Sequence, residues 1–212
     1  MFVPELYRCA DPTWHAKTIR GYPLATLTSN GPRTPFATHV PVIAPHEVGD
    51  CLVGIELTGH MNRANPHWAA LHDGTPARLM FDGPCGYITP TLYRTGPAAP
   101  TWDFTSVHVR GTVQLIEDRD ETLDVVCRTA ETFEEAFGDS WDQASSLDYF
   151  RSILPGVGAF RLRVEEVDGM YKLSQEKPRQ VQERVIKRFE SSNTGLHRSL
   201  AEVMRGFGLG EP

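Results

Sequence analysis

The chain has 212 residues, of which 40% are hydrophobic and 23% charged, and its net charge is -6. That size and composition fit one globular domain that can bury a substantial core. The negative charge argues against a protein that binds nucleic acid through a clustered basic face, and no apolar run reaches the roughly 20 residues that cross a bilayer.

The N-terminal stretch and the cysteines indicate a cytoplasmic protein. MFVPELYRCADP contains acidic residues and prolines, and it lacks the basic-then-apolar order of a secretion signal. Four cysteines lie far apart, with no CxxC spacing, at Cys9, Cys51, Cys85 and Cys127. This spacing favours buried, reduced thiols over a disulfide framework or a zinc site.

The first two-thirds of the chain predicts β-strands. Segments with apolar residues are separated by turn-forming residues, in the order PLATLTSNGP, FATHVPVI, CLVGIEL, ARLMFDG and GYITP. In the next segment, SVHVRGTVQLI, the residues Val107, Val109 and Val113 alternate with polar residues. That period of two predicts an antiparallel strand with one buried and one polar face.

The last third predicts mainly helices. Between Glu121 and Phe137, apolar residues recur every three or four positions, as on an amphipathic helix. SSLDYFRSILPG predicts a shorter helix, and GVGAFRLRVEEVDGMYKLSQ predicts a long strand or a hairpin that turns at Asp168–Gly169. KPRQVQERVIKRFE and LHRSLAEVMRGFG predict two closing helices. We therefore predict a single α+β barrel domain over residues 1–212, with peripheral helices at its C-terminus.

The segment GHMNRANPHW, at residues 59–68, gathers polar side chains where the apolar run LVGIEL ends. Asn65-Pro66 predicts a helix start, with an Asn cap and Pro in the first helical turn. His60 and Arg63 are therefore expected on a strand-to-helix connection, where rigid scaffolds often present functional groups.

His60 has two interpretations that the residues alone leave open. It is either an axial ligand of heme iron, since neutral imidazole is a strong iron donor, or a histidine that hydrogen-bonds a backbone carbonyl. His39 and His108, inside predicted strands, are the second and third choices for the iron. A zinc site from His60, His67 and His72 is disfavoured, because these spacings place the rings on different faces and no HExxH pattern occurs.

Two further segments could contact a ligand. The Gly-, Pro- and aromatic-rich FDGPCGYITPTLYRTGPAAPTWDF contains Tyr87, Tyr93 and Trp102, whose rings can stack on a planar group, although such a segment is equally a long connection. In KLSQ, Lys172 and Ser174 can hold a phosphate or carboxylate, or can simply be a solvated strand end. No GxGxxG, Walker loop or GxSxG elbow is present.

Four ordered motifs, LTGHMNRANPHW, FDGPCGYITPTLY, PTWDFTSVHVRG and MYKLSQE, resemble the PaiB-like family of split-barrel proteins. The resemblance runs from about Phe2 to about Lys187. That family is described as FMN-binding and includes negative transcriptional regulators. The resemblance implies a split β-barrel, similar to FMN-binding proteins, that forms a homodimer with its cofactor near the subunit interface.

Within this family, GHMNRANPHWAAL, YRTGPAAPTWDFTSVHVRG and SLDYFRSILPGVGAFRLRV look most similar to the heme-dependent piperazate synthases. Regulator-like members tend to read YISPSWYPSK where this chain reads YITPTLYRTG, and PTWN has become PTWD at Asp103. Because a lysine that could bind the flavin phosphate is lost, heme b becomes the expected cofactor, with FMN as the alternative.

The resemblance implies that the chain converts N5-hydroxyornithine to piperazic acid, closing a nitrogen–nitrogen bond with loss of water. His60 would bind the iron, and Arg63, Lys172, Ser174 and Gln175 would contact the cofactor. Tyr93, Lys172 or a water would act as the catalytic acid, and Arg63, Arg110 or Lys172 would hold the substrate carboxylate. The alternatives are an FMN-binding regulator, whose only candidate DNA-facing segment is KPRQVQERVIKRFE, and a flavin- or heme-binding oxidoreductase. Neither a membrane nor nucleic acid is expected as a partner.

Overall fold

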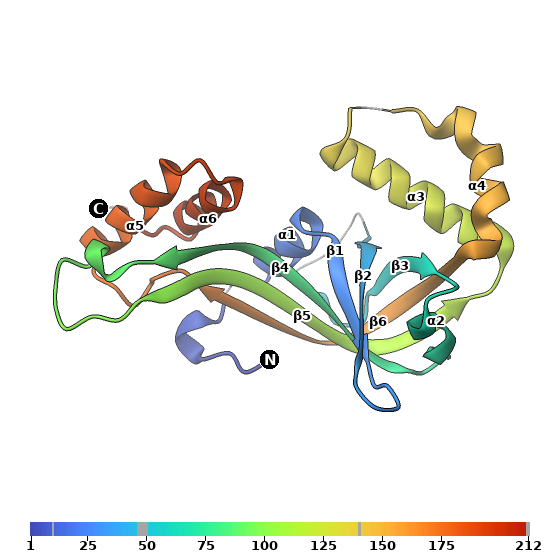
Figure 1. Ribbon diagram of the computed structural model, residues 1–212, viewed down its shortest axis with the longest axis horizontal. Coiled ribbons are helices and arrows are strands. Elements are labelled where there is room, and N and C mark those ends of the chain that lie inside the picture. The colour runs from blue at the N-terminus through green and yellow to red at the C-terminus, as the bar shows by residue number, and fades with distance from the viewer. Residues whose placement is uncertain (10, 46–50, 140, 211–212) are drawn as a thin grey trace. The chain divides into compact units, whose positions relative to one another are not determined.

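A computed structural model of the protein describes residues 1–9, 11–45, 51–139 and 141–210. These residues form six strands, with helices before, between and after them. Figure 1 shows their arrangement. The chain forms two compact units. The barrel unit consists of residues 19–81 and 108–167, and the terminal unit consists of residues 1–18, 82–107 and 168–212.

Six strands form a closed barrel in the order β1-β2-β3-β6-β5-β4. Antiparallel pairing joins β1 to β2 and β4, and β3 to β2 and β6. The strands are β1 (Leu24–Ser29), β2 (Phe36–Ile43), β3 (Glu56–Asn62), β4 (Pro76–Ile88), β5 (Thr101–Ile116) and β6 (Val157–Lys172). The last three each contribute residues to both units. The predicted α+β barrel with peripheral helices is therefore confirmed.

The barrel unit has an apolar interior built by alternation along its strands. In β1, every second residue is buried, as expected for a strand with one face on a core. Phe160 on β6 is fully buried and belongs to this interior, with Leu27, Val40, Leu57, Leu79 and Leu162. Helix α3 (Arg119–Phe137) packs against β2 and β3, and the unit also contains α2 (Pro66–Ala70), η3 (Gln143–Ser146), α4 (Leu147–Ile153) and η4 (Leu154–Gly156).

The terminal unit has a core of its own. Helices α5 (Arg179–Glu190) and α6 (Gly195–Gly206) lie side by side (Figure 1). They bury Phe189, Leu200 and Met204, and Tyr171 and Leu173 at the end of β6 are also buried. The unit also contains η1 (Glu5–Tyr7), η2 (Pro90–Leu92) and most of α1 (Thr13–Gly21).

Several element boundaries differ from the sequence-based prediction. The third strand was expected at CLVGIEL, but β3 spans Glu56–Asn62, so His60 lies inside a strand and not on a connection. ARLMFDG and GYITP form one strand, β4. The predicted long strand is confirmed as β6, which continues through Asp168–Gly169 without the alternative hairpin. Helix α1 was not predicted. The cysteines are free, as expected, but none is buried, and Cys51 is exposed.

Candidate functional site

A groove of about 650 Å³ opens on the barrel unit around His60. Its walls come from β2, β3, the turn before α2, and the segment that joins α4 to β6. The lining residues are Thr38, His39, Pro41, His60, Met61, Asn62, Asn65, Ile153, Gly156 and Val157. This volume lies within the range of about 300 to 1,000 Å³ that is common for small-molecule and cofactor sites.

Strand alternation directs His60 to the groove. Leu57 and Met61 on β3 are buried, whereas His60, which pairs with Ala159, is only partly exposed on the other face. Its Nδ1 atom is buried and has no hydrogen-bond partner among the described residues. Burial lowers the pKa of His60, so its ring is neutral at pH 7. A neutral imidazole with a free nitrogen is what a metal ion requires of histidine.

His39 shares the groove with His60. Val42 on β2 pairs with Gly59 on β3, and the alternation of side chains then places His39 and His60 on the same outward face. The His39 ring is exposed, and its Nδ1 lies 3.2 Å from Thr26 Oγ1. Two imidazoles on adjacent strands therefore border one cavity, and one of them is fixed by a hydroxyl group.

Of the remaining histidines, His67 is structural. It is 1% exposed, and its two ring nitrogens lie 2.9 Å from the hydroxyls of Ser29 and Thr38. Both nitrogens of the His67 ring are thus occupied by hydrogen bonds, so His67 cannot join His60 and His72 in a zinc site. The described residues contain no cluster of three or more His, Cys, Asp or Glu suited to a metal. His108, the third choice for the iron, is half-buried on β5.

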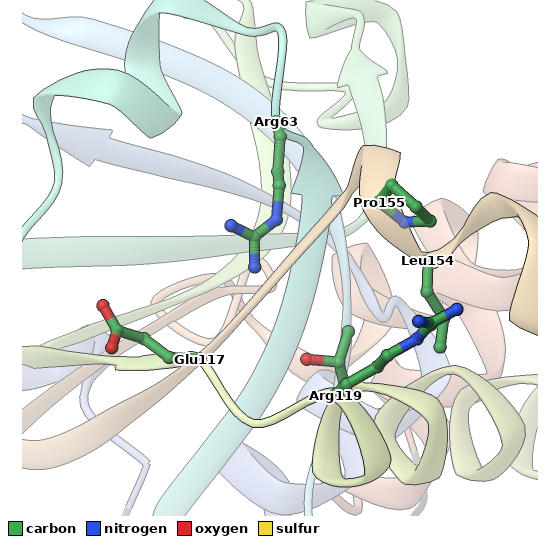
Figure 2. Close-up of a pocket in the computed structure, with 6 residues that line it drawn as sticks. Arg63, Glu117, Arg119, Leu154 and Pro155 are labelled. Atoms are coloured by element: carbon green, nitrogen blue, oxygen red, sulfur yellow. The ribbon is translucent and has the colours of Figure 1, made fainter.

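Asn65 caps helix α2 as predicted, and the turn that it stabilises also orients Arg63. The Asn65 side chain accepts a hydrogen bond from His67 N at 2.9 Å. Arg63 Nε donates to the Val157 carbonyl at 2.7 Å, and the guanidinium lies 5.4 Å from the centre of the Trp68 ring. Arg63 lines a second cavity, of about 210 Å³, shown in Figure 2.

The terminal unit gathers the other predicted site residues around Asp103, which the sequence-based prediction did not select. Ser174 Oγ donates to Asp103 Oδ2 at 2.6 Å, and the Lys172 ammonium donates to Thr101. Gln175 is bound to backbone: its Nε2 donates to Tyr171 O at 2.7 Å, and its Oε1 accepts from Leu173 N at 2.7 Å.

Asp103 is a buried acid with one satisfied and one unsatisfied oxygen. It is fully buried, and its Oδ1 has no hydrogen-bond partner among the described residues. Burial raises the pKa of Asp103 to about 6, with a further increase from the charge of Glu176, while the hydrogen bond from Ser174 opposes the rise. The PTWD motif, noted only for its departure from PTWN, is the signal that could have identified this group.

Tyr93 is 5% exposed, and its hydroxyl is likewise buried without a partner in the described chain. Burial raises the pKa of Tyr93, and the charges of Asp103 and Glu176 add to the effect. The ammonium of Lys177 lies 4.7 Å from the centre of the Tyr93 ring. Tyr93 is therefore protonated at neutral pH and could donate a proton or a hydrogen bond.

The predicted site residues thus fall into two groups. His60 and Arg63 belong to the barrel unit, and Tyr93, Lys172, Ser174 and Gln175 belong to the terminal unit. The proposed roles of all six stay predictions. Arg110, a candidate for the substrate carboxylate, forms an ion pair with Glu166.

Two exposed aromatic residues of the terminal unit, Tyr87 and Trp102, lie together. Tyr87 is 48% exposed and Trp102 is 55% exposed, and their rings meet edge to face with centroids 5.8 Å apart. Such a pair offers a surface on which a planar ligand could stack.

Comparison with known proteins finds one relative similar in sequence over nearly the whole chain and two solved structures of similar fold. The protein "Protease synthase and sporulation protein PAI 2" of Bacillus subtilis is 26% identical over 208 residues, covering 96% of each chain. The FAD and heme binding protein of Mycobacterium smegmatis has a TM-score of 0.57 at 16% identity, over 78% of this chain and 73% of the other. The flavocytochrome Anf3 of Azotobacter vinelandii has a TM-score of 0.50 at 16% identity, over 73% and 66%.

These likenesses confirm the split-barrel fold class. Separately, none of the described helices is long and apolar enough to cross a membrane. The sequence profile of one protein family, described as "Putative FMN-binding domain", matches residues 1–166. Since this match covers most of the chain and agrees with the PAI 2 relative, the chain belongs to the family of "Putative FMN-binding domain" proteins.

Proposed function

We propose that this chain is a heme-dependent enzyme in which His60 binds the iron. The observation that carries the proposal is the His60 ring: it is neutral, one of its nitrogens is buried without a partner among the described residues, and it borders a groove of about 650 Å³. A histidine that merely stabilised the strand would be expected to use its buried nitrogen in a hydrogen bond, as His67 does. His60 does not.

The proposed reaction is the one that the sequence resemblance implies, ring closure of N5-hydroxyornithine to piperazic acid. The α-amine nitrogen forms a bond to N5, the N5–oxygen bond breaks, and the oxygen leaves as water after gaining a proton. The amine nitrogen gives up a proton in the same reaction, so one water is lost overall. A bound iron would supply Lewis-acid polarisation of the hydroxylamine.

The protein must hold the substrate in a folded conformation, take a proton from the α-amine and give one to the departing oxygen. Holding the α-amine and N5 in contact removes much of the entropic barrier to ring closure. His39 lies on the same face as His60, and its Nδ1 is fixed by Thr26, so its other nitrogen can carry a proton to a ligand in the groove. Tyr93, Lys172 or a water remains the candidate acid for the departing oxygen.

Two of the comparisons support a heme cofactor without defining the reaction. The Mycobacterium smegmatis protein of similar fold is described as binding FAD and heme, and the Azotobacter vinelandii protein as a flavocytochrome. We extend heme binding to this chain because of His60, and not because of the fold, which hosts many functions.

FMN binding is the second candidate, and the family description together with the Tyr87–Trp102 pair favours it. An isoalloxazine ring could stack on these exposed aromatics. Its phosphate would need free cationic or hydroxyl donors, yet Ser174 donates to Asp103 and Lys172 donates to Thr101. The carboxylate of Asp103 would also repel a phosphate at this position. Heme therefore fits the described residues better.

The test combines cofactor uptake with turnover. Purified protein is loaded with hemin or with FMN, incubated with N5-hydroxyornithine, and analysed by mass spectrometry. We expect a product lighter by one water with hemin only. His60→Ala should abolish product formation, and His72→Ala, an exposed histidine in the same unit, should leave it unchanged. FMN uptake with no response to hemin would reject the heme proposal and support the second candidate.

A further inference from the structure

Asp103 and Tyr93 place two unpartnered polar atoms in the interior of the terminal unit. Asp103 is fully buried, and Tyr93 is 5% exposed. Neither Asp103 Oδ1 nor the Tyr93 hydroxyl has a hydrogen-bond partner among the described residues. The charge of Asp103 acts on Tyr93 and also on Tyr7, so the three side chains lie within range of one another. Because buried polar groups are almost always hydrogen-bonded, two such atoms in one unit indicate a missing partner.

Both residues are held in place by the structure around them. Ser174 Oγ donates to Asp103 Oδ2 at 2.6 Å, and a terminal nitrogen of Arg184 donates to the backbone carbonyl of Tyr93 at 3.1 Å. Ser174 has a φ of 60°, and Arg94, which follows Tyr93, has a φ of 56°; within the described chain they are the non-glycine residues with positive φ. Such backbone conformations are costly, and they gather at ligand-binding and catalytic sites.

The neighbouring charges leave the carboxylate of Asp103 without a cation in direct contact among the described residues. The Lys172 ammonium donates to Thr101, and the Lys177 ammonium pairs with Glu176 at 3.4 Å. The charge of Glu176 disfavours the ionised carboxylate, and the charge of Lys172 favours it without contact. A buried carboxylate is stabilised most by a cation that also donates a hydrogen bond to it.

We propose that Asp103 and Tyr93 bind the ammonium group of a small primary amine. Asp103 Oδ1 would accept one N–H of the ammonium, and the hydroxyl oxygen of Tyr93 would accept another. A primary ammonium has the charge and the several donors that this pair of acceptors requires, whereas a quaternary ammonium has no donor. The tyrosine rings also suit a cation: Lys177 lies 4.7 Å from the centre of the Tyr93 ring, and Lys172 lies 6.0 Å from that of Tyr7. Tyr7 and both lysines are only partly buried, so the site lies near the surface of the unit.

Binding is measured by calorimetry on the full chain at pH 8, with methylammonium as the probe. Tetramethylammonium tests the need for N–H donors, methanol tests the need for charge, and potassium at matched ionic strength tests screening. We expect saturable binding of methylammonium and little binding of the other three probes. Equal binding of tetramethylammonium or potassium would overturn the ligand class. Absence of saturable methylammonium binding would overturn the site and leave water as the partner of both atoms.

Variants connect the binding to these side chains. Asp103→Asn should weaken methylammonium binding by at least about 10-fold, as expected for loss of one charge-assisted hydrogen bond. Tyr93→Phe keeps the ring and removes the hydroxyl, so it should weaken binding less than Asp103→Asn does. Asp82→Asn, which changes an exposed acid that accepts a hydrogen bond from Ser106 at 2.8 Å, is the matched control and should bind normally. Unchanged affinity in a folded Asp103→Asn variant would contradict the proposal.

The affinity for methylammonium should also depend on pH. The titratable and charged groups that face Asp103 or Tyr93 are Tyr7, Lys172, Glu176 and Lys177. Burial raises the pKa values of both tyrosines, so they stay protonated near neutral pH. Because the pKa of Asp103 is about 6, affinity should rise about 10-fold per pH unit below that value and level off above it. An affinity that is constant between pH 5 and pH 8 would contradict an ion pair with Asp103.

The ammonium site is independent of the heme assignment, and the His60→Ala variant separates the two. This variant should bind methylammonium as the wild type does, and hemin-loaded and unloaded protein should bind it equally well. Loss of methylammonium binding on loading with hemin would mean that Asp103 and Tyr93 contact the cofactor, and the separate amine site would be rejected. The role of His60 would be unaffected.

Discussion

Asp103 is the residue whose ionisation should be visible in the stability of the protein. Its pKa is raised from 3.8 to about 6 by burial, so the folded state disfavours the carboxylate. The stability contribution of Asp103 is therefore fully present below pH 3.8 and is lost as the pH rises through about 6. At pH 8 the cost approaches about 3 kcal/mol, because one pKa unit corresponds to about 1.4 kcal/mol.

Asp103→Asn should therefore increase the free energy of unfolding at pH 8 by about 2 to 3 kcal/mol. Most of that gain should disappear near pH 4. Denaturant titrations at the two pH values measure it, and Asp82→Asn, an exposed acid on β4 that accepts a hydrogen bond from Ser106, is the control. Equal stability of Asp103→Asn and wild type at pH 8 would mean that the charge of Asp103 is compensated.

His39 is the groove residue to which the proposed function assigns proton transfer. His39→Gln keeps a polar side chain that can still contact Thr26, but it removes the titratable nitrogen. We expect kcat to fall by at least about 10-fold, as is common for loss of a general acid or base. The hemin spectrum should stay as in the wild type. Unaltered kcat would exclude His39 from the reaction.

The side-chain contacts that could not be predicted from the sequence are those between residues far apart along the chain. Asn65 as a helix cap follows from its neighbours and was predicted correctly. Asp103 meets Ser174 across 71 positions, and His67 meets Ser29 across 38. No local pattern reveals such pairs: the PTWD motif marks Asp103 but not its contact with Ser174, and His67 was considered only as a zinc ligand.

At the scale of elements, the packing of strand β3 against its neighbours requires a residue without a side chain at Gly59. A Cβ atom at this position would lie 2.8 Å from Phe160 Cζ and 3.1 Å from Pro41 O. Because Phe160 is fully buried in the barrel unit, it has little room to move. Gly59→Ala should destabilise the protein by about 1 to 3 kcal/mol, the usual range for an overpacked core.

Thermal unfolding measures this change, and Gly21→Ala, where the added Cβ meets nothing within 4 Å, is the matched control. Gly59→Ala should also disturb the position of His60, its neighbour on β3, and broaden the hemin spectrum. A Gly59→Ala variant as stable as Gly21→Ala would show that the Phe160 contact does not constrain the strand.

The false break predicted within β4 has a clear physical cause. Gly and Pro between ARLMFDG and GYITP are turn signals by composition, yet β4 continues through them. Gly86 is needed for close packing, because a Cβ there would lie 2.5 Å from the Phe189 ring. A glycine that makes room for a distant helix cannot be distinguished from a turn glycine by local sequence. Strands and helices with clear periodicity, such as β2 and α3, were predicted well.

At the scale of the whole molecule, the charge distribution argues against a DNA-binding regulator. The basic residues of α5 are largely engaged: Arg184 donates to Leu92 O and Tyr93 O, and Lys187 pairs with Glu183. With a net charge of -6, the chain should not shift promoter DNA in a gel assay at physiological salt. Retarded DNA at that salt concentration would favour the regulator interpretation.

That the protein forms a homodimer and that it is located in the cytoplasm both remain proposals. Light scattering on the purified chain should give a mass near twice 23.7 kDa. A monomer at all concentrations would contradict the expectation drawn from the family resemblance and would require each chain to complete its own cofactor site.

The central claim is that His60 binds the heme iron. The measurement that tests it most directly is a hemin titration monitored by absorption spectroscopy, on wild type, His60→Ala and His39→Ala. We predict a sharp, saturable Soret band for the wild type and for His39→Ala. His60→Ala should lose or shift the band, and added imidazole should restore it. An identical spectrum and affinity in His60→Ala would show that the neutral imidazole on β3 does not bind the iron.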